Sequence, residues 1–114
     1  MELVWSSLAK EQLRNVLSYV EEEYGYRIAQ KTLLNISQKV NQLLSYPERG
    51  ILDAKLSSLS FSDNYVIRHI LVLPNVIYYI VKNNSVIIIA IAHTKQSPST
   101  IRKMIKAFLR QNKE

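Results

Sequence analysis

Apolar residues in the first half of the chain recur with the period of an α-helix. In residues 7–24, and again in residues 28–44, apolar positions repeat every three or four residues, with polar and charged residues between them. Gly25 separates the two segments, and Pro47 follows the second. Because the link between them is so short, we expect two amphipathic helices that fold back on each other as an antiparallel hairpin.

The second half of the chain has the pattern of β-strands. Residues 65–73, 76–82 and 85–93 are rich in Val, Ile and Tyr, which favour strands. The pairs Pro74-Asn75 and Asn83-Asn84 separate these segments, and two-residue turns of this kind join antiparallel neighbours. We therefore expect a three-stranded antiparallel meander.

Three further segments complete the expected elements. Residues 2–5 predict a short strand, and residues 47–64 predict a connecting loop with a short strand at 55–61. Ser97-Pro98 supplies an N-cap and a first-turn proline for a C-terminal helix. The predicted fold class is α+β, with an N-terminal strand, an antiparallel helical hairpin packed on an antiparallel β-sheet, and a C-terminal helix.

Both faces of the expected sheet are apolar. Strict alternation along the last strand gives two sets, with Ile87, Ile89 and Ile91 on one face and Val86, Ile88 and Ala90 on the other. A single layer of helices covers only one of these faces. We expect the second face either to receive the C-terminal helix or to remain open for a partner protein.

The composition excludes several classes of function. A chain of 114 residues, 47% of them hydrophobic, suits one domain with its own core. The absence of cysteine excludes disulfides and thiolate chemistry, and two glycines are too few for a dinucleotide fingerprint or a phosphate-binding loop. The longest apolar run, residues 86–92, is far below the roughly 20 residues that cross a bilayer. We expect a soluble cytoplasmic protein without membrane contact.

Few residues are candidates for chemistry. His69 and His93 lie on different expected strands without ligands at helical spacing, and no serine has the glycines of a nucleophile elbow, so we expect no metal and no cofactor. Basic residues near the sheet, above all Arg68, His93 and Lys95, could position a phosphodiester, with His93 as acid or base. The alternative for His93 is a structural bond to a loop backbone.

Positive charge is concentrated in the second half of the chain. The net charge is +6, yet residues 1–63 hold seven Lys/Arg against eight Asp/Glu, whereas residues 64–114 hold eight Lys/Arg against Glu114 alone. Such a surface attracts nucleic acid, acidic protein segments or anionic membranes. The basic C-terminal helix therefore has three candidate roles: nucleic-acid contact, docking on the sheet of its own domain, or binding of an acidic partner segment.

The order of the elements and several local patterns resemble the RelE/ParE superfamily of type II toxin–antitoxin toxins. Residues 44–50, with Pro47 and Gly50, are similar to the segment with which that family leaves its helical hairpin. Arg68 stands where members usually have an arginine, and residues 76–81 resemble their aromatic strand. Residues 89–98 are similar to the closing strand and its tail.

The resemblance implies a bacterial toxin that a cognate antitoxin protein neutralises. Residues 1–98 would form the toxin domain and residues 99–114 a basic amphipathic helix of the same domain. The disordered, acidic tail of the antitoxin would fold over exposed apolar surface, and operator DNA would be bound only through the antitoxin complex.

The resemblance leaves the activity open. A ParE-like poison of DNA gyrase needs binding surface and no catalytic group, whereas a RelE-like, metal-independent, ribosome-dependent mRNA endoribonuclease would use Arg68, His93 and Lys95. Nucleases of the superfamily have a basic residue where this chain has Val76, and an aromatic or basic residue near Ile101. These differences favour the gyrase poison, and an inactive member that acts only as a binding protein is a third alternative.

Overall fold

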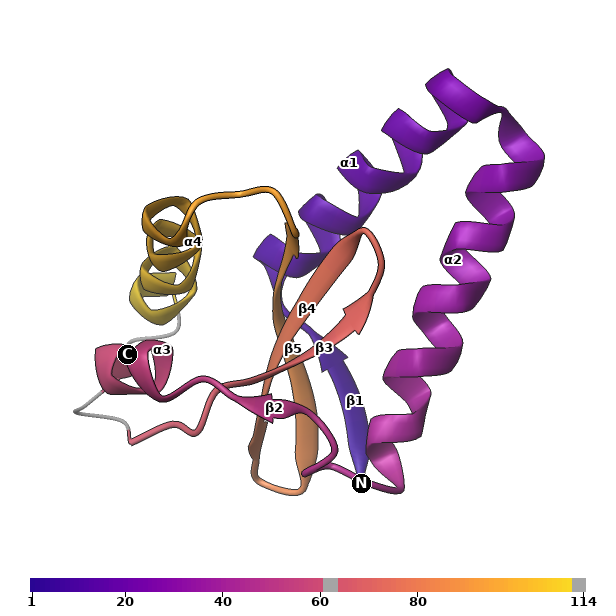
Figure 1. Cartoon of the computed structure of the whole chain (residues 1–114). Helices are drawn as coiled ribbons and strands as arrows, with labels where there is room; N and C mark the ends of the chain where they lie inside the picture. The colour runs from indigo at the N-terminus through magenta and orange to yellow at the C-terminus, as the bar shows by residue number, and fades with distance from the viewer. Residues whose placement is uncertain (61–63, 112–114) are drawn as a thin grey trace.

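A five-stranded sheet lies between two layers of helices (Figure 1), in a computed structural model that describes residues 1–60 and 64–111. The strands are β1 (Glu2–Trp5), β2 (Ile51–Leu52), β3 (Arg68–Val72), β4 (Asn75–Lys82) and β5 (Ser85–His93), in the order β1-β5-β4-β3-β2. The helices are α1 (Ser7–Tyr24), α2 (Tyr26–Asn41), α3 (Ala54–Ser57) and α4 (Pro98–Gln111), with 3-10 turns η1 (Gln42–Leu44) and η2 (Ser58–Ser60). All paired strands are antiparallel except β1, which runs parallel to β5. The expected α+β fold class is confirmed.

The helical hairpin forms as the sequence predicts because both ends of α1 carry clear signals. The Oγ of Ser6 accepts a hydrogen bond from the Ala9 N–H at 3.0 Å and so caps the helix. Gly25 ends it with φ +94 and ψ 167, a region that is essentially restricted to glycine. The chain then turns directly into α2, which continues as η1 up to Leu44.

The strict alternation expected for β5 is wrong beyond its centre. The register between β4 and β5 shifts between Tyr78 and Tyr79, which leaves Ile89 without a partner on β4. Beyond this bulge the two faces exchange, so that Ile91 packs in the core under the hairpin and Ala90 in the core under α4.

The start of α1 satisfies the edge of β5 at this bulge. β1 pairs with β5 only as far as Trp5, which faces Ile88. Beyond that point the Oγ of Ser6 donates to the Ile89 carbonyl at 3.1 Å, and the Oε1 of Gln12 accepts from the Ile91 N–H at 2.7 Å. Side chains from the N-cap and the first turns of α1 therefore form the hydrogen bonds to β5 that β1 no longer supplies.

The connection between hairpin and meander differs from the expectation. The short strand expected at 55–61 is wrong, because residues 54–57 form α3 and residues 58–60 form η2, while Phe61 lies outside the described residues. Leu56 is buried, and the Oγ of Ser57 donates to the Asp53 carbonyl at 2.7 Å and accepts from the Ile67 N–H at 2.8 Å. The Ser57 hydroxyl thus forms hydrogen bonds with backbone groups that a paired strand would otherwise satisfy.

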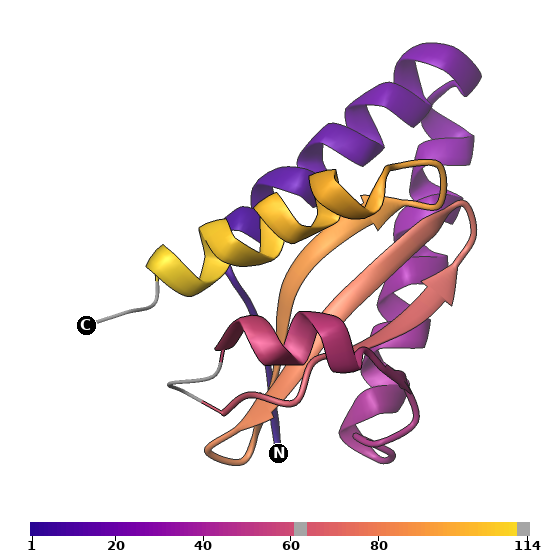
Figure 2. The same cartoon turned by 60° about the vertical axis from the view of Figure 1, so that its left-hand side comes forward.

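Each face of the sheet has its own core, and α4 covers the second face (Figure 2). The core under the hairpin is formed by Ala9, Ile36, Val40, Leu43, Ile77, Tyr79, Val86, Ile88 and Ile91. The core under α3 and α4 is formed by Leu56, Ile67, Val76, Tyr78, Ile80, Ile89, Ala90, Ala92, Ile105, Phe108 and Leu109. Of the two alternatives for the second face, the structure shows docking of the chain's own C-terminal helix.

Tyr79 ties the exit of the hairpin to the centre of the sheet. Its side chain is fully buried, and its Oη donates to the Pro47 carbonyl at 2.7 Å and accepts from the Gly50 N–H at 2.8 Å. Gly50 approaches the ring so closely that a Cβ would lie 2.6 Å from both Cε1 and Oη of Tyr79. The Pro47 and Gly50 pattern in the sequence therefore has a structural role in holding this segment against β4.

The two central tyrosines predict a loss of stability at alkaline pH. Burial raises the pKa of Tyr79, and burial followed by the nearby Asp53 carboxylate raises the pKa of Tyr78, both from the usual 10.0. Above about pH 10 the unfolded chain loses these protons while the folded chain keeps them. The free energy of unfolding should therefore fall as pH rises past 10, by up to about 1.4 kcal/mol per pH unit for each tyrosine.

Urea denaturation between pH 8 and 11 measures this dependence. Tyr78→Phe should flatten the slope by the share of one tyrosine, while Tyr19→Phe, at an exposed position, should leave it unchanged. Equal slopes in wild type and Tyr78→Phe would contradict the prediction.

Candidate functional site

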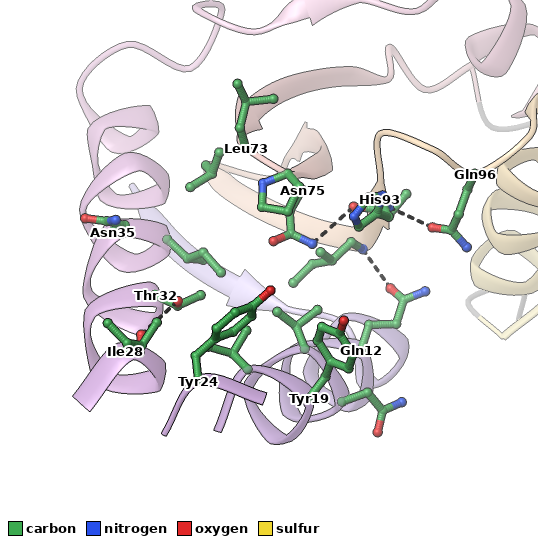
Figure 3. A pocket seen from close by; sticks show the side chains of 18 of the residues that line it. Gln12, Tyr19, Tyr24, Ile28, Thr32, Asn35, Leu73, Asn75, His93 and Gln96 are labelled. Atoms are coloured by element: carbon green, nitrogen blue, oxygen red, sulfur yellow. Dashed lines mark hydrogen bonds between the residues drawn. The ribbon is translucent and has the colours of Figure 1, made fainter. Parts of the chain in front are cut away.

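A cavity of about 660 Å³ lies between the helical hairpin and the end of the sheet (Figure 3). We call it the hairpin groove. It is lined by Gln12, Asn15, Val16, Tyr19, Val20, Tyr24, Ile28, Thr32, Asn35, Ile36, Val72, Leu73, Pro74, Asn75, Ile91, Ala92, His93, Gln96 and Met104. None of these residues is Asp, Glu, Lys or Arg, so the groove is mostly apolar, with neutral amide and hydroxyl groups and no formal charge apart from His93.

The groove exists because the hairpin is longer than the sheet on which it packs. An 18-residue helix such as α1 spans about 27 Å, and in Figure 1 the tip of the hairpin projects beyond the strands. The apolar stripes continue onto this projecting part, where Tyr19, Tyr24 and Ile28 are 59%, 65% and 45% exposed. Leu73, in the turn between β3 and β4, is 75% exposed across the groove. The helical side chains continue the apolar stripes that pack on the sheet elsewhere in the hairpin, but here no strand lies against them.

Three polar side chains of the groove, those of Gln12, Gln96 and Asn75, already use hydrogen bonds within the chain. Gln12 accepts from the Ile91 N–H, and the Oε1 of Gln96 accepts from the His93 N–H, each at 2.7 Å. Asn75, which is 6% exposed, donates its Nδ2 to the Ala92 carbonyl at 3.5 Å. No buried side-chain nitrogen or oxygen in the described residues lacks a partner. The groove is therefore suited to bury apolar side chains of a ligand rather than to bind a charged group.

Arg68, one of the three residues expected to act in phosphodiester chemistry, lies away from the groove, opposite Tyr79 at the start of β3. Its Nη1 donates to the Gly50 carbonyl at 3.0 Å and to the Glu48 carbonyl at 3.3 Å. The guanidinium thus reinforces the same hairpin exit that Tyr79 holds.

His93 and Lys95 lie together, but not with Arg68. The Nδ1 of His93 accepts the Lys95 N–H at 3.0 Å, so Nε2 is the ring nitrogen that remains for a ligand. Arg68 is paired with Tyr79 and His93 with Asn75, four residues apart on β4. At about 3.3 Å per residue, and across two strand spacings of about 4.8 Å, the backbones are separated by roughly 13 Å along the sheet and 10 Å across it. The structure does not bring the three residues into one site.

The positions where superfamily nucleases carry further polar groups are apolar and covered in this chain. Val76 is 8% exposed in the core under α4, and Ile101, on α4 itself, packs against the same core. α4 therefore covers the face of the sheet on which Val76 lies, and Ile101 is part of that cover.

Two further features of the described residues bear on chemistry. The Nδ1 of His69 lies 2.5 Å from the Oδ2 of Asp53, which is an ion pair when the imidazole is protonated. Among residues 1–60 and 64–111, no group of three or more His, Asp or Glu side chains could hold a metal ion. No helix in the same ranges is long and apolar enough to cross a membrane.

The hairpin groove was not identified from the sequence. Its apolar positions, such as Tyr24 and Ile28, were interpreted as core positions of the two helices. The available signal was length, because the apolar stripes of α1 and α2 extend further than five-residue β3 or nine-residue β5 can cover.

A match to one family model shows the family to which this chain belongs. Residues 3–98 match the family described as the ParE toxin of the type II toxin–antitoxin system, parDE. A solved chain from the chromosomal ParDE TA system of P. aeruginosa shares the fold with a TM-score of 0.65 and 18% sequence identity, over 82% of this chain and 95% of that chain. The comparison with curated proteins found no match. The family match confirms the resemblance to the RelE/ParE superfamily and its ParE branch, and the chain belongs to the ParE toxin family of type II toxin–antitoxin systems.

Proposed function

We propose that this chain inhibits bacterial growth by poisoning DNA gyrase, and that a cognate antitoxin neutralises it by inserting an amphipathic helix into the hairpin groove. Membership of the ParE toxin family supports the toxin role and the existence of an antitoxin partner. Because gyrase acts on DNA in the bacterial cytoplasm, the proposal also places the chain there. Operator DNA is contacted through the antitoxin.

The shape and chemistry of the groove support its role as the antitoxin site. It has helices on one side and the end of a sheet on the other, which suits a helix that presents apolar side chains at every third or fourth position. Tyr19, Tyr24 and Leu73 offer exposed apolar area for such anchors. Acidic residues on the outer side of the antitoxin segment would complement the net charge of +6.

The positions of Arg68 and His93 favour gyrase poisoning over mRNA cleavage. A nuclease needs its charged groups around one phosphodiester, but these two residues lie on different strands at β4 positions four residues apart, and Arg68 is bound to backbone carbonyls. α4 packs over the second face of the sheet, and its own Ile101 joins Val76 of β4 in the core between them. A poison that acts by binding requires none of these groups.

Two assays with the purified full chain distinguish the candidate activities. We expect inhibition of gyrase supercoiling, reversed by the cognate antitoxin, and no cleavage of ribosome-bound mRNA. Cleavage of mRNA without an effect on gyrase would establish the RelE-like alternative. Normal growth of cells that express the chain without its antitoxin would identify an inactive member that acts only as a binding protein.

A double variant at the remaining candidate nuclease residues tests the same proposal. In His93→Asn/Lys95→Ala, the asparagine Oδ1 can replace the Nδ1 acceptor while the proton-transferring imidazole is lost. We expect gyrase inhibition within about threefold of wild type, because no catalytic step is involved. Loss of a general acid or base would lower a nuclease activity by about 10²- to 10⁴-fold, so a loss of toxicity on that scale would contradict the proposal.

A further inference from the structure

The outward face of α4 carries an unbroken set of cations. Its buried side is formed by Ile105, Phe108 and Leu109. Next to this buried side, four exposed basic residues form what we call the outward face: Arg102, Lys103, Lys106 and Arg110. At about 100° per residue, these four positions fall within an arc of about 100° on the helix. Figure 2 shows α4 lying against the sheet, and the four basic residues are on the part of the helix that this packing leaves exposed.

These cations are not neutralised within the described part of the protein. The structure gives none of the four an ion pair with a carboxylate, since the His69–Asp53 contact is the acid–base pair found there. α4 contains no Asp or Glu between Pro98 and Gln111. As far as the described residues go, the face has a positive potential without a paired carboxylate, and such a potential attracts polyanions over about a Debye length.

The spacing of the cations fits the phosphate backbone of a duplex. Arg102, Lys106 and Arg110 follow one another at four-residue intervals, or about 6 Å along the helix. Over the resulting 12 Å or so, a nucleic-acid duplex carries about seven negative charges. We propose that the outward face of α4 binds the phosphate backbone of double-stranded nucleic acid.

Two other polyanions fit this face less well. A single strand needs aromatic side chains on which its bases stack, and the aromatic residue of α4, Phe108, is buried. An acidic protein segment would find no exposed apolar side chain within the cationic arc, and exposed ion pairs alone contribute only about 0–1 kcal/mol each. The inference goes beyond the proposed gyrase poisoning and does not require it.

Binding of the full chain to labelled 20-base-pair duplexes, followed by fluorescence anisotropy between 50 and 200 mM salt, tests this inference. Four phosphate contacts predict a slope of roughly −3.6 in a plot of log affinity against log salt concentration. Lys103→Ala/Lys106→Ala should reduce the magnitude of that slope by about 2. The matched control Arg27→Ala/Lys31→Ala removes the same charge from exposed positions on α2 and should change the slope by less than about 0.5.

The same assay also distinguishes DNA from RNA as the duplex that supplies the phosphate backbone. DNA and RNA duplexes of the same sequence are compared, and the duplex that binds more tightly is identified as the ligand of this surface. Tighter binding of the single strand, tighter binding of polyglutamate, or an equal effect of the α2 control would overturn the proposal. A wild-type supercoiling assay fails or succeeds independently of these measurements, so the two proposals are tested separately.

Discussion

Gly50→Ala is expected to lower the free energy of unfolding by about 3 kcal/mol. The added Cβ would lie 2.6 Å from Cε1 and Oη of Tyr79 and 2.9 Å from the carbonyl oxygen of His69. Tyr79 is fully buried and held by two hydrogen bonds, so its ring cannot move aside without losing both. Urea denaturation at pH 7, followed by far-ultraviolet circular dichroism, measures the change.

Two comparison variants separate this steric effect from a general sensitivity to losing glycine. Gly25→Ala meets no atom within 4 Å but keeps φ +94, so it should cost only the backbone strain, about 1–3 kcal/mol. In a Tyr79→Leu background, Gly50→Ala should cost much less than in wild type, because the clashing ring is absent. The close packing inferred here is wrong if the cost of Gly50→Ala is the same in both backgrounds.

Tyr24→Asp/Ile28→Asp is expected to weaken antitoxin binding at least about 100-fold, equivalent to about 2.7 kcal/mol. Both side chains line the hairpin groove and are more than 40% exposed, so the fold does not depend on them. A carboxylate at either place would be buried without a partner when an apolar helix enters, which is costly. Titration of the purified antitoxin by calorimetry measures the loss.

The hairpin offers a matched control for each substitution. Tyr26 is 65% exposed and Leu34 is 57% exposed, and neither lines the groove. Tyr26→Asp/Leu34→Asp adds the same charge to the same hairpin, at two positions of α2, and should leave the affinity within about threefold of wild type. If the two double variants weaken binding equally, the antitoxin does not use the groove.

The elements that the sequence predicts well are those with local signals at their ends. α1 runs from Ser7 to Tyr24 as expected because a serine cap and a glycine in a restricted conformation define it. The β4–β5 hairpin also forms as expected, with Asn83 and Asn84 at φ 51 and φ 59 in the turn. Each of these signals acts within a few residues of the chain, so no tertiary contact is needed to interpret it.

The elements that were predicted wrongly depend on contacts between distant residues. The bulge at Ile89 occurs where β1 ends and Ser6 takes over the pairing, which links residues that are 83 positions apart. Residues 54–57 form a helix because Ser57 bonds to Ile67 across the connection. A local pattern of alternating residues contains neither contact.

Local sequence patterns also do not predict the candidate site. Tyr24 and Leu73 come from opposite halves of the chain and face one groove only because the hairpin extends past the sheet. The sequence groups Arg68 and His93 because both lie on expected strands with basic neighbours, and the register of β4 separates them. The family resemblance predicted the class of protein, but it did not predict which surface forms the candidate site.

Hydrogen–deuterium exchange of the full chain, free and bound to its cognate antitoxin, most directly tests whether the hairpin groove is the surface that the partner completes. We predict slower exchange on binding around Tyr19 to Ile28 and around Leu73, with α4 unchanged, because α4 is already docked on its own sheet. Protection of α4 with no change in the hairpin would contradict this conclusion.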